Sequence, residues 1–370
     1  MFDRDISKKS LPHLPNLMTR GMIAANIAAA GAMLTRTCST KYGQMLDYDA
    51  GPLTKGDIAI LRFLAAVELI ESDLWQQYEE LGGVTQGPQN SYQLALQFLD
   101  GDAAQYITSN TLDEISHATY LNAYLESEGA DHVDFDKFRA LRGSTATGAQ
   151  NIGRLSNLMH LDMDTNWFIH YRSLENPGFG ASFPQALRIV NRQAIPRTDA
   201  DFDGPHHIQA IANTAAFHFG YIEHAGSTLY ASLSQKVRRA SVLKITLGIG
   251  GDEIAHFLAW VNFTRNAIQG PPFSFHKAQS LVAKQNMPVP NFSAKPGGPL
   301  RSHLSFPVPG DSTTKNAAYG PVIRLLEDQF SGAVATINSF TQNGLFVGQS
   351  PEFMNTLIQM AEDADEAIRN

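Results

Sequence analysis

Two short stretches decide how this chain folds: TLDEISHA (residues 111–118) and GDEIAHFL (residues 251–258). Each contains Glu-x-x-His preceded by an aspartate, each lies in a helical pattern, and the chain has no third Glu-x-x-His. Residues three apart on an α-helix are neighbours on one face, with Cβ atoms roughly 5–6 Å apart. The glutamate and the histidine of each stretch can therefore point one oxygen and one nitrogen at a single ion.

A second acidic helix is predicted upstream of each stretch, because a glutamate interrupts an apolar face in LAAVELIE (residues 64–71) and again in FGYIEHAG (residues 219–226). Burying a carboxylate is costly unless it is paired or coordinates a metal. Four helices that turn these groups inward would place four carboxylates and two imidazoles around one point of a bundle core. The predicted metal ligands are Glu68, Glu114, His117, Glu223, Glu253 and His256.

Three further acidic residues have open roles in this pattern. A single Glu-x-x-His is most often part of a solvated face, but two of them, each after an acid on an apolar stripe, favour a metal site. Glu71, one turn after Glu68, can be a ligand, a base beside the ligands or a surface acid. Asp113 and Asp252 point about 100° away from the adjacent ligand glutamates. They form salt bridges or caps, or they orient a histidine of a neighbouring helix through its other nitrogen.

Composition excludes several classes of protein. The chain has 370 residues, enough for a sizeable core, and 43% of them are hydrophobic, which is typical of a globular protein. Its net charge is −8 and no basic tract stands out, so we expect no nucleic-acid partner. The single cysteine, Cys38, excludes an intramolecular disulfide and a cysteine-based metal site.

The N-terminus leaves localisation open. Residues 21–34 form an apolar run of small side chains that is too short to span a membrane, so we expect no stable membrane insertion. The run resembles the apolar part of a degenerate export signal, with Lys8, Lys9 and Arg20 ahead of it. Acidic residues before the run, and the absence of a twin arginine, argue against export. Both an exported (periplasmic or extracellular) and a cytoplasmic protein fit this pattern.

Turn signals and helical periodicity divide the chain into three parts. We expect an N-terminal tail or export leader (1–53), a helical bundle (54–268), and an irregular segment with C-terminal helices that pack on the bundle (269–370). A long insert (130–205) separates the second and third helices and serves as a lid or as a cap. The predicted bundle helices span residues 54–82, 107–127 (after a break near Gly101), 206–233 and 236–268. Glycines 248, 250 and 251 in the fourth helix predict close packing or a local distortion that opens space for a substrate.

The chain resembles the ferritin-like superfamily, and within it the group that includes plant desiccation-related proteins and many bacterial, often secreted, proteins. The resemblance is carried by residues 57–68, by 110–117 with 121–125, and by 251–256. It implies an all-α fold: a ferritin-like four-helix bundle with a long insert between helices 2 and 3 and extra C-terminal helices. It also implies the same six metal ligands. The longer separation of Glu68 from Glu114 than of Glu223 from Glu253 predicts extra structure between the first two helices.

The leading functional prediction is a di-metal carboxylate oxidoreductase that activates dioxygen or peroxide. Hard oxygen donors with a few imidazoles suit two iron or manganese ions better than copper or zinc. Glu114 and Glu253 would bridge the ions. Glu68 and Glu223 would be terminal ligands, and one histidine would complete each ion.

An alternative of another class is a non-catalytic stress- or desiccation-associated protein, in which the metal is sequestered or staples the bundle. Mineral storage in a ferritin cage is third, because the insert and the tail would obstruct shell packing. We expect a small-molecule or oxidant as partner, and the sequence leaves a homo-oligomer open. The metal, the substrate and the catalytic residues are not identified by the sequence.

Overall fold

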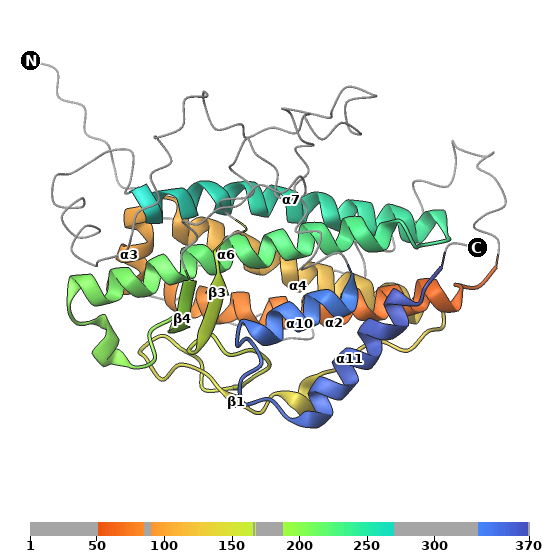
Figure 1. Cartoon of the computed structure of the whole chain (residues 1–370), viewed down its shortest axis with the longest axis horizontal. Helices are drawn as coiled ribbons and strands as arrows, with labels where there is room; N and C mark the ends of the chain where they lie inside the picture. Colours follow the sequence, from red (N-terminus) through yellow and green to blue (C-terminus); the bar gives the residue numbers. More distant parts are fainter. Residues whose placement is uncertain (1–50, 85–89, 166, 168–187, 270–331, 369–370) are drawn as a thin grey trace, which may run out of the picture. The chain divides into compact units, whose positions relative to one another are not determined.

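The computed structural model describes residues 51–84, 90–165, 167, 188–269 and 332–368, all within one compact unit. This part of the chain is mostly helical, which confirms the predicted all-α class (Figure 1). The predicted leader and most of the irregular segment after residue 269 lie outside the described residues. The described α-helices are α2 (Lys55–Gly82), α3 (Ser91–Leu99), α4 (Ala103–Ser127), α6 (Pro205–Ser234), α7 (Ala240–Gln269), α10 (Ala333–Gln342) and α11 (Pro351–Asp365).

The ends of the long helices follow local sequence signals. Thr54 caps α2, and its hydroxyl accepts a hydrogen bond from the backbone N–H of Asp57 at 3.0 Å, as expected for a threonine N-cap. The predicted break near Gly101 separates α3 from α4. Helix α3 is the extra structure predicted from the long separation of Glu68 from Glu114. The predicted start of the fourth helix at Lys236 is wrong, because α7 begins at Ala240. The link before it is held against α2, where the Asp57 carboxylate accepts from the backbone N–H of Arg238 at 2.8 Å.

The four long helices form two antiparallel pairs, α2 with α4 and α6 with α7. Just beyond the end of α2, the N–H of Val84 donates to Thr108 near the start of α4, at 2.9 Å. At the end of α6, the Ser234 hydroxyl donates to Thr246 near the start of α7, at 2.8 Å. Within these pairs the apolar faces are buried and form the core, and α3 packs on α6 (Figure 1).

The insert contains two small antiparallel hairpins, β1 (Leu141–Arg142) with β2 (Gly153–Arg154), and β3 (Leu161–Asp164) with β4 (Arg188–Arg192). Asp73 of α2 binds this region, because its carboxylate accepts from the backbone N–H groups of Leu155 and Ser156 at 3.0 and 2.9 Å. Asp73 lies about 140° around the helix from Glu68. Asp73 thus holds the insert on a side of α2 that is turned away from Glu68. Of the two roles predicted for the insert, lid and cap, these contacts favour the cap. Residues 168–187 lie outside the described part.

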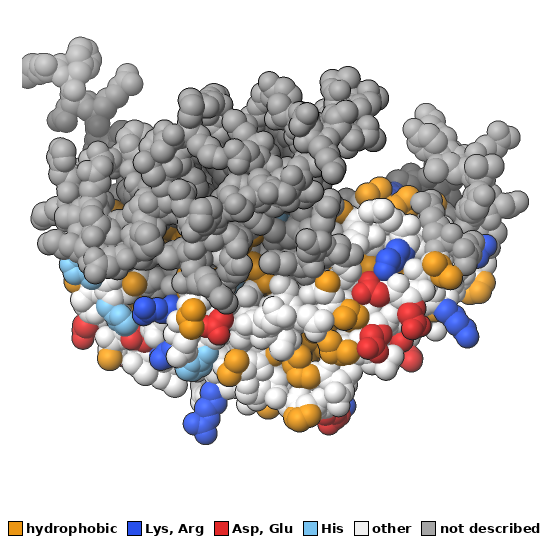
Figure 2. All heavy atoms as spheres, viewed as in Figure 1, with side chains coloured by type: hydrophobic (Ala, Val, Ile, Leu, Met, Phe, Trp, Pro, Cys, Tyr) orange, Lys and Arg blue, Asp and Glu red, His pale blue; other side chains and the backbone are white. Residues whose placement is uncertain are grey.

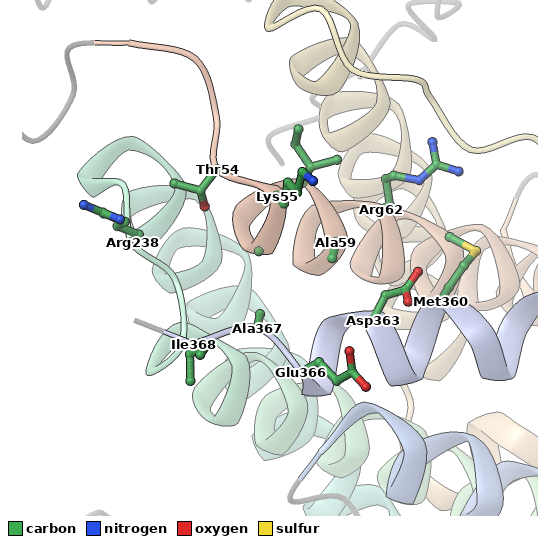
Figure 3. Close-up of a pocket in the computed structure, with 12 residues that line it drawn as sticks. Thr54, Lys55, Ala59, Arg62, Arg238, Met360, Asp363, Glu366, Ala367 and Ile368 are labelled. Carbon is green, nitrogen blue, oxygen red and sulfur yellow. The ribbon is translucent and has the colours of Figure 1, made fainter. Parts of the chain in front are cut away.

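The C-terminal helices pack on the long ones, α10 on α6 and α11 on α2. The Asp365 carboxylate near the end of α11 accepts from the first backbone N–H groups of α10, those of Ala333 and Val334, both at 3.0 Å. A surface groove of about 630 Å³ lies where the first turns of α2 meet the end of α11 (Figure 3). Its lining mixes basic residues, such as Lys55, with acidic ones, such as Asp363.

The described surface has a mixed character. On the face shown in Figure 2, apolar, acidic and basic side chains are interspersed, so this face presents no continuous basic surface among the described residues. No described helix combines the length and the apolar composition that a membrane span requires.

The three glycines of α7 do not distort it, since the helix is continuous from Ala240 to Gln269. A Cβ atom on Gly250 would lie 2.9 Å from the Cβ of Tyr230 on α6, whereas one on Gly248 or Gly251 would meet no atom within 4 Å. Close packing therefore explains Gly250. The continuous helix shows no break at these glycines, and the predicted space for a substrate stays a prediction.

Candidate metal centre

The structure brings all six predicted residues together between α2, α4, α6 and α7, in two overlapping groups that can each hold a metal ion. Within a group, one potential ligand atom of every residue lies within 4.8 Å of those of the others. Glu114 and Glu253 belong to both groups. The first group is Glu68, Glu114, His117 and Glu253, and the second is Glu114, Glu223, Glu253 and His256.

Both histidines turn Nδ1 toward the carboxylates. The Nδ1 atom of His117 lies 3.2 Å from Oε2 of Glu114, which is the contact that the three-residue spacing predicts. The Nδ1 atom of His256 lies 3.1 Å from Oε1 of Glu114 and 3.2 Å from Oε2 of Glu223. Glu114 therefore lies between the two imidazoles.

The outward nitrogen of each histidine meets an aspartate of the opposite helix. Nε2 of His256 on α7 lies 3.2 Å from Oδ2 of Asp113 on α4, and Nε2 of His117 on α4 lies 3.5 Å from Oδ2 of Asp252 on α7. Each aspartate thus contacts a histidine of a neighbouring helix, as both the salt-bridge role and the orienting role require, and the orienting role stays a prediction. Such a contact fixes the tautomer and the direction of a metal-binding imidazole.

Replacing these aspartates will weaken metal binding without unfolding the chain. We expect Asp113→Asn and Asp252→Asn each to lower metal affinity about 10–100-fold, the range typical of carboxylates that orient ligand histidines. The side chains are half or more exposed, so stability should change little. Titration with Mn²⁺ measures the affinity, and the exposed Asp203→Asn is the matched control. Unchanged affinity in both variants would show that the aspartates do not support the site.

Three polar residues that the sequence did not single out hold the carboxylates in place. The amide of Asn110 donates to Oε1 of Glu114 at 2.7 Å and to Oε1 of Glu223 at 3.0 Å. Trp260 donates in turn to the amide oxygen of Asn110 at 2.7 Å. The Tyr230 hydroxyl donates to Oε1 of Glu68. Their only signal in the sequence is a helical spacing of one or two turns from a ligand.

Gly226 makes room for the shared carboxylate of Glu253. A Cβ atom at this position of α6 would lie 2.0 Å from Oε2 of Glu253, far inside any allowed contact. The helix has no positive φ here, so the need for glycine arises from this close approach alone. Gly226 thus allows the close approach of α6 to the side chain of Glu253.

The centre is negative and short of hydrogen-bond donors. Oε2 of Glu68 and both carboxylate oxygens of Glu253 are buried and accept no hydrogen bond from any described residue. Burial, with the nearby charges of Glu114 and Glu223, raises the pKa of Glu253 well above its ordinary value. Burial, with the charge of Glu223, raises the pKa of Glu114 to about 7.

The two imidazoles show the same excess of negative charge. Burial alone would lower the pKa of His117, but Glu68 and Glu114 outweigh it and raise that pKa to about 12. Burial likewise opposes protonation of His256, and Glu223, Asp113 and Glu114 outweigh it and raise its pKa strongly. No buried Lys or Arg in the described part of the chain neutralises the cluster. The cluster therefore suits metal cations, which bind by displacing protons from its carboxyl groups and imidazoles.

Comparisons of this protein with protein-family models, curated proteins and solved structures found no match. The site is therefore described by its own chemistry: a buried cluster of carboxylates and imidazoles that can hold a metal ion.

Proposed function

We propose that the chain is a ferritin-like four-helix bundle that holds two iron or manganese ions and acts as an oxidoreductase on dioxygen or peroxide. The observation that carries the proposal is the overlap of the two ligand groups in Glu114 and Glu253. Two ions that share carboxylates lie close enough to act on one small molecule together. Each group also has its own glutamate and its own histidine, which supports two similar sites rather than one.

The donor set supports the choice of metal. Each ion would have three carboxylates and one imidazole within reach, a combination that suits iron or manganese better than copper or zinc. Four carboxylates carry the charge that neutralises two divalent ions. When bound, such ions supply electrons to dioxygen or peroxide.

The chain's own residues would bind, orient and shield. Glu114 and Glu253 would bridge, Glu68 and Glu223 would each hold one ion, and Asn110 would keep two of these carboxylates from turning away. On one side of the cluster, Trp75 stacks on Phe219 and on Trp260, Phe219 is tilted against Trp260, and the three buried rings would exclude water. On the other side the histidines are 8% and 12% exposed, which supports access for a small oxidant between α4 and α7.

The alternative is a non-catalytic, stress- or desiccation-associated metal-binding or structural protein. One observation favours it: the ligands come from all four long helices, so bound metal would tie both helix pairs together. In this case the metal stabilises the fold and nothing is turned over.

Oxidant consumption separates the two functions. The wild-type chain, loaded with Fe²⁺ without oxygen or with Mn²⁺, is given dioxygen or hydrogen peroxide, and consumption is followed with an electrode. We expect many hydrogen peroxide molecules to be consumed per chain with at least one metal, because peroxide is both oxidised and reduced in disproportionation, or many dioxygen molecules when ascorbate is supplied as the reductant. Neither oxidant should be consumed above background in Glu114→Ala/Glu253→Ala. Tight metal binding with a higher melting temperature but no turnover would favour the structural alternative.

A further inference from the structure

Glu71 of α2 is a buried acid without a hydrogen-bond partner. Its side chain is 1% exposed, and neither carboxylate oxygen accepts a hydrogen bond from any described residue. It lies outside both ligand groups, one turn after Glu68 on the same face of the helix. Burying a carboxylate in this way costs several kcal/mol unless something compensates it.

The other acids buried on α2 show that this isolation is specific to Glu71. Asp73 accepts two backbone hydrogen bonds from the insert and pairs with Arg139 at 2.7 Å. Glu80 pairs with Arg154. The fold therefore supplies hydrogen-bond donors to Asp73 and Glu80, the buried acids of this helix that serve packing. It supplies none to Glu71.

Its place on α2, one turn after the ligand Glu68 on the same face of the helix, puts Glu71 beside the metal centre. Burial and the carboxylate of Glu253, followed by those of Glu114, Glu68 and Glu223, raise the pKa of Glu71 well above its ordinary value. Glu253 itself has two carboxylate oxygens without hydrogen bonds.

We propose that Glu71 is a seventh protein donor to the metal pair, offered from the same face of α2 as Glu68. The inference rests on the proposed di-metal site and extends its ligand set beyond the six residues of the two groups. In the absence of metal, Glu71 is a cost to stability. With metal bound, it adds an oxygen donor, and its removal weakens the hold on at least one ion.

The test separates metal affinity from stability. Glu71→Gln and Glu71→Met are titrated with Mn²⁺, using the electron paramagnetic resonance signal of free Mn²⁺, and the metal-free proteins are melted. We expect affinity for at least one ion to fall about tenfold or more. We expect the metal-free melting temperature to rise, because an uncompensated buried acid is gone. The control Asp73→Asn should do the opposite, with lower stability and unchanged affinity.

Each result of the titration and melting experiments supports or overturns the role of Glu71 as a metal donor. If Glu71→Gln binds two Mn²⁺ as tightly as the wild type, Glu71 is not a donor, while the di-metal proposal stands. If affinity and metal-free stability fall together, the substitution has damaged the fold and the inference is overturned. If the wild type binds no Mn²⁺, both proposals fail. Should Glu71→Met not fold, the nearly isosteric Glu71→Gln decides alone.

Discussion

Replacing Glu114 and Glu253 together by alanine will abolish metal binding at both positions. The two residues belong to both ligand groups, so each ion loses two of its four protein donors at once. The remaining residues, one glutamate and one histidine for each ion, come from different helices and leave both ions weakly held. We therefore expect metal content to fall to background from about two ions per chain, the number in a pair that shares carboxylates.

The same double variant should lose the stabilisation that metal gives. A ligand that binds only the folded state at 100 times its dissociation constant stabilises that state by about 2.7 kcal/mol. The wild type should therefore melt at a higher temperature with Mn²⁺ than without, and the variant at the same temperature in both conditions. Glu362→Ala/Glu366→Ala is the matched control, because Glu362 of α11 and Glu366, the residue just after this helix, are both exposed acids. A variant that still responds to Mn²⁺ like the wild type would contradict the shared role of Glu114 and Glu253.

Gly226→Ala should remove most metal binding by adding a single methyl group. The new Cβ would overlap Oε2 of Glu253, and the Cδ atom of Glu253 lies only 2.8 Å from the same point. Glu253 must rotate away or α6 and α7 must separate, and either change withdraws a donor from both ions. The expected loss of affinity for both ions exceeds the roughly 10–100-fold effect of a residue that only orients a ligand.

Away from such a close approach, replacing glycine by alanine in a helix interior normally stabilises the fold by about 1 kcal/mol. Gly248→Ala on α7 is the control, because its Cβ meets no atom within 4 Å. It should raise stability and leave Mn²⁺ affinity unchanged. Wild-type Mn²⁺ affinity in Gly226→Ala would show that the position of Glu253 does not matter to the centre.

Local spacing was enough to predict which residues meet, because the decisive contacts are helical. Glu114 and His117 share a face by their three-residue separation alone, and the aspartate before each ligand glutamate must point sideways. These spacings left a contact of Asp113 and Asp252 with a histidine of a neighbouring helix as one of their open roles, and the structure shows such contacts for both. The N-cap at Thr54 follows from equally local chemistry.

Contacts that depend on how the helices are set against one another could not be predicted. The distance from Gly226 to Glu253, and the hydrogen bond from Tyr230 to Glu68, are fixed by the relative depth of neighbouring helices. Residue spacing within one helix carries no information on that depth. The hairpin strands of the insert are also too short to show a two-residue alternation, as the two-residue strands β1 and β2 illustrate.

We propose that two ions share Glu114 and Glu253. A stoichiometric titration combined with spectroscopy tests this sharing directly. The metal-free wild type is titrated with Mn²⁺, free ion is counted, and the resonance spectrum of the bound ions is recorded at saturation. We expect two ions per chain, with a spectrum altered by magnetic coupling, since carboxylate-sharing pairs lie about 3.5–4 Å apart. One ion per chain, two uncoupled ions, or no binding would contradict it.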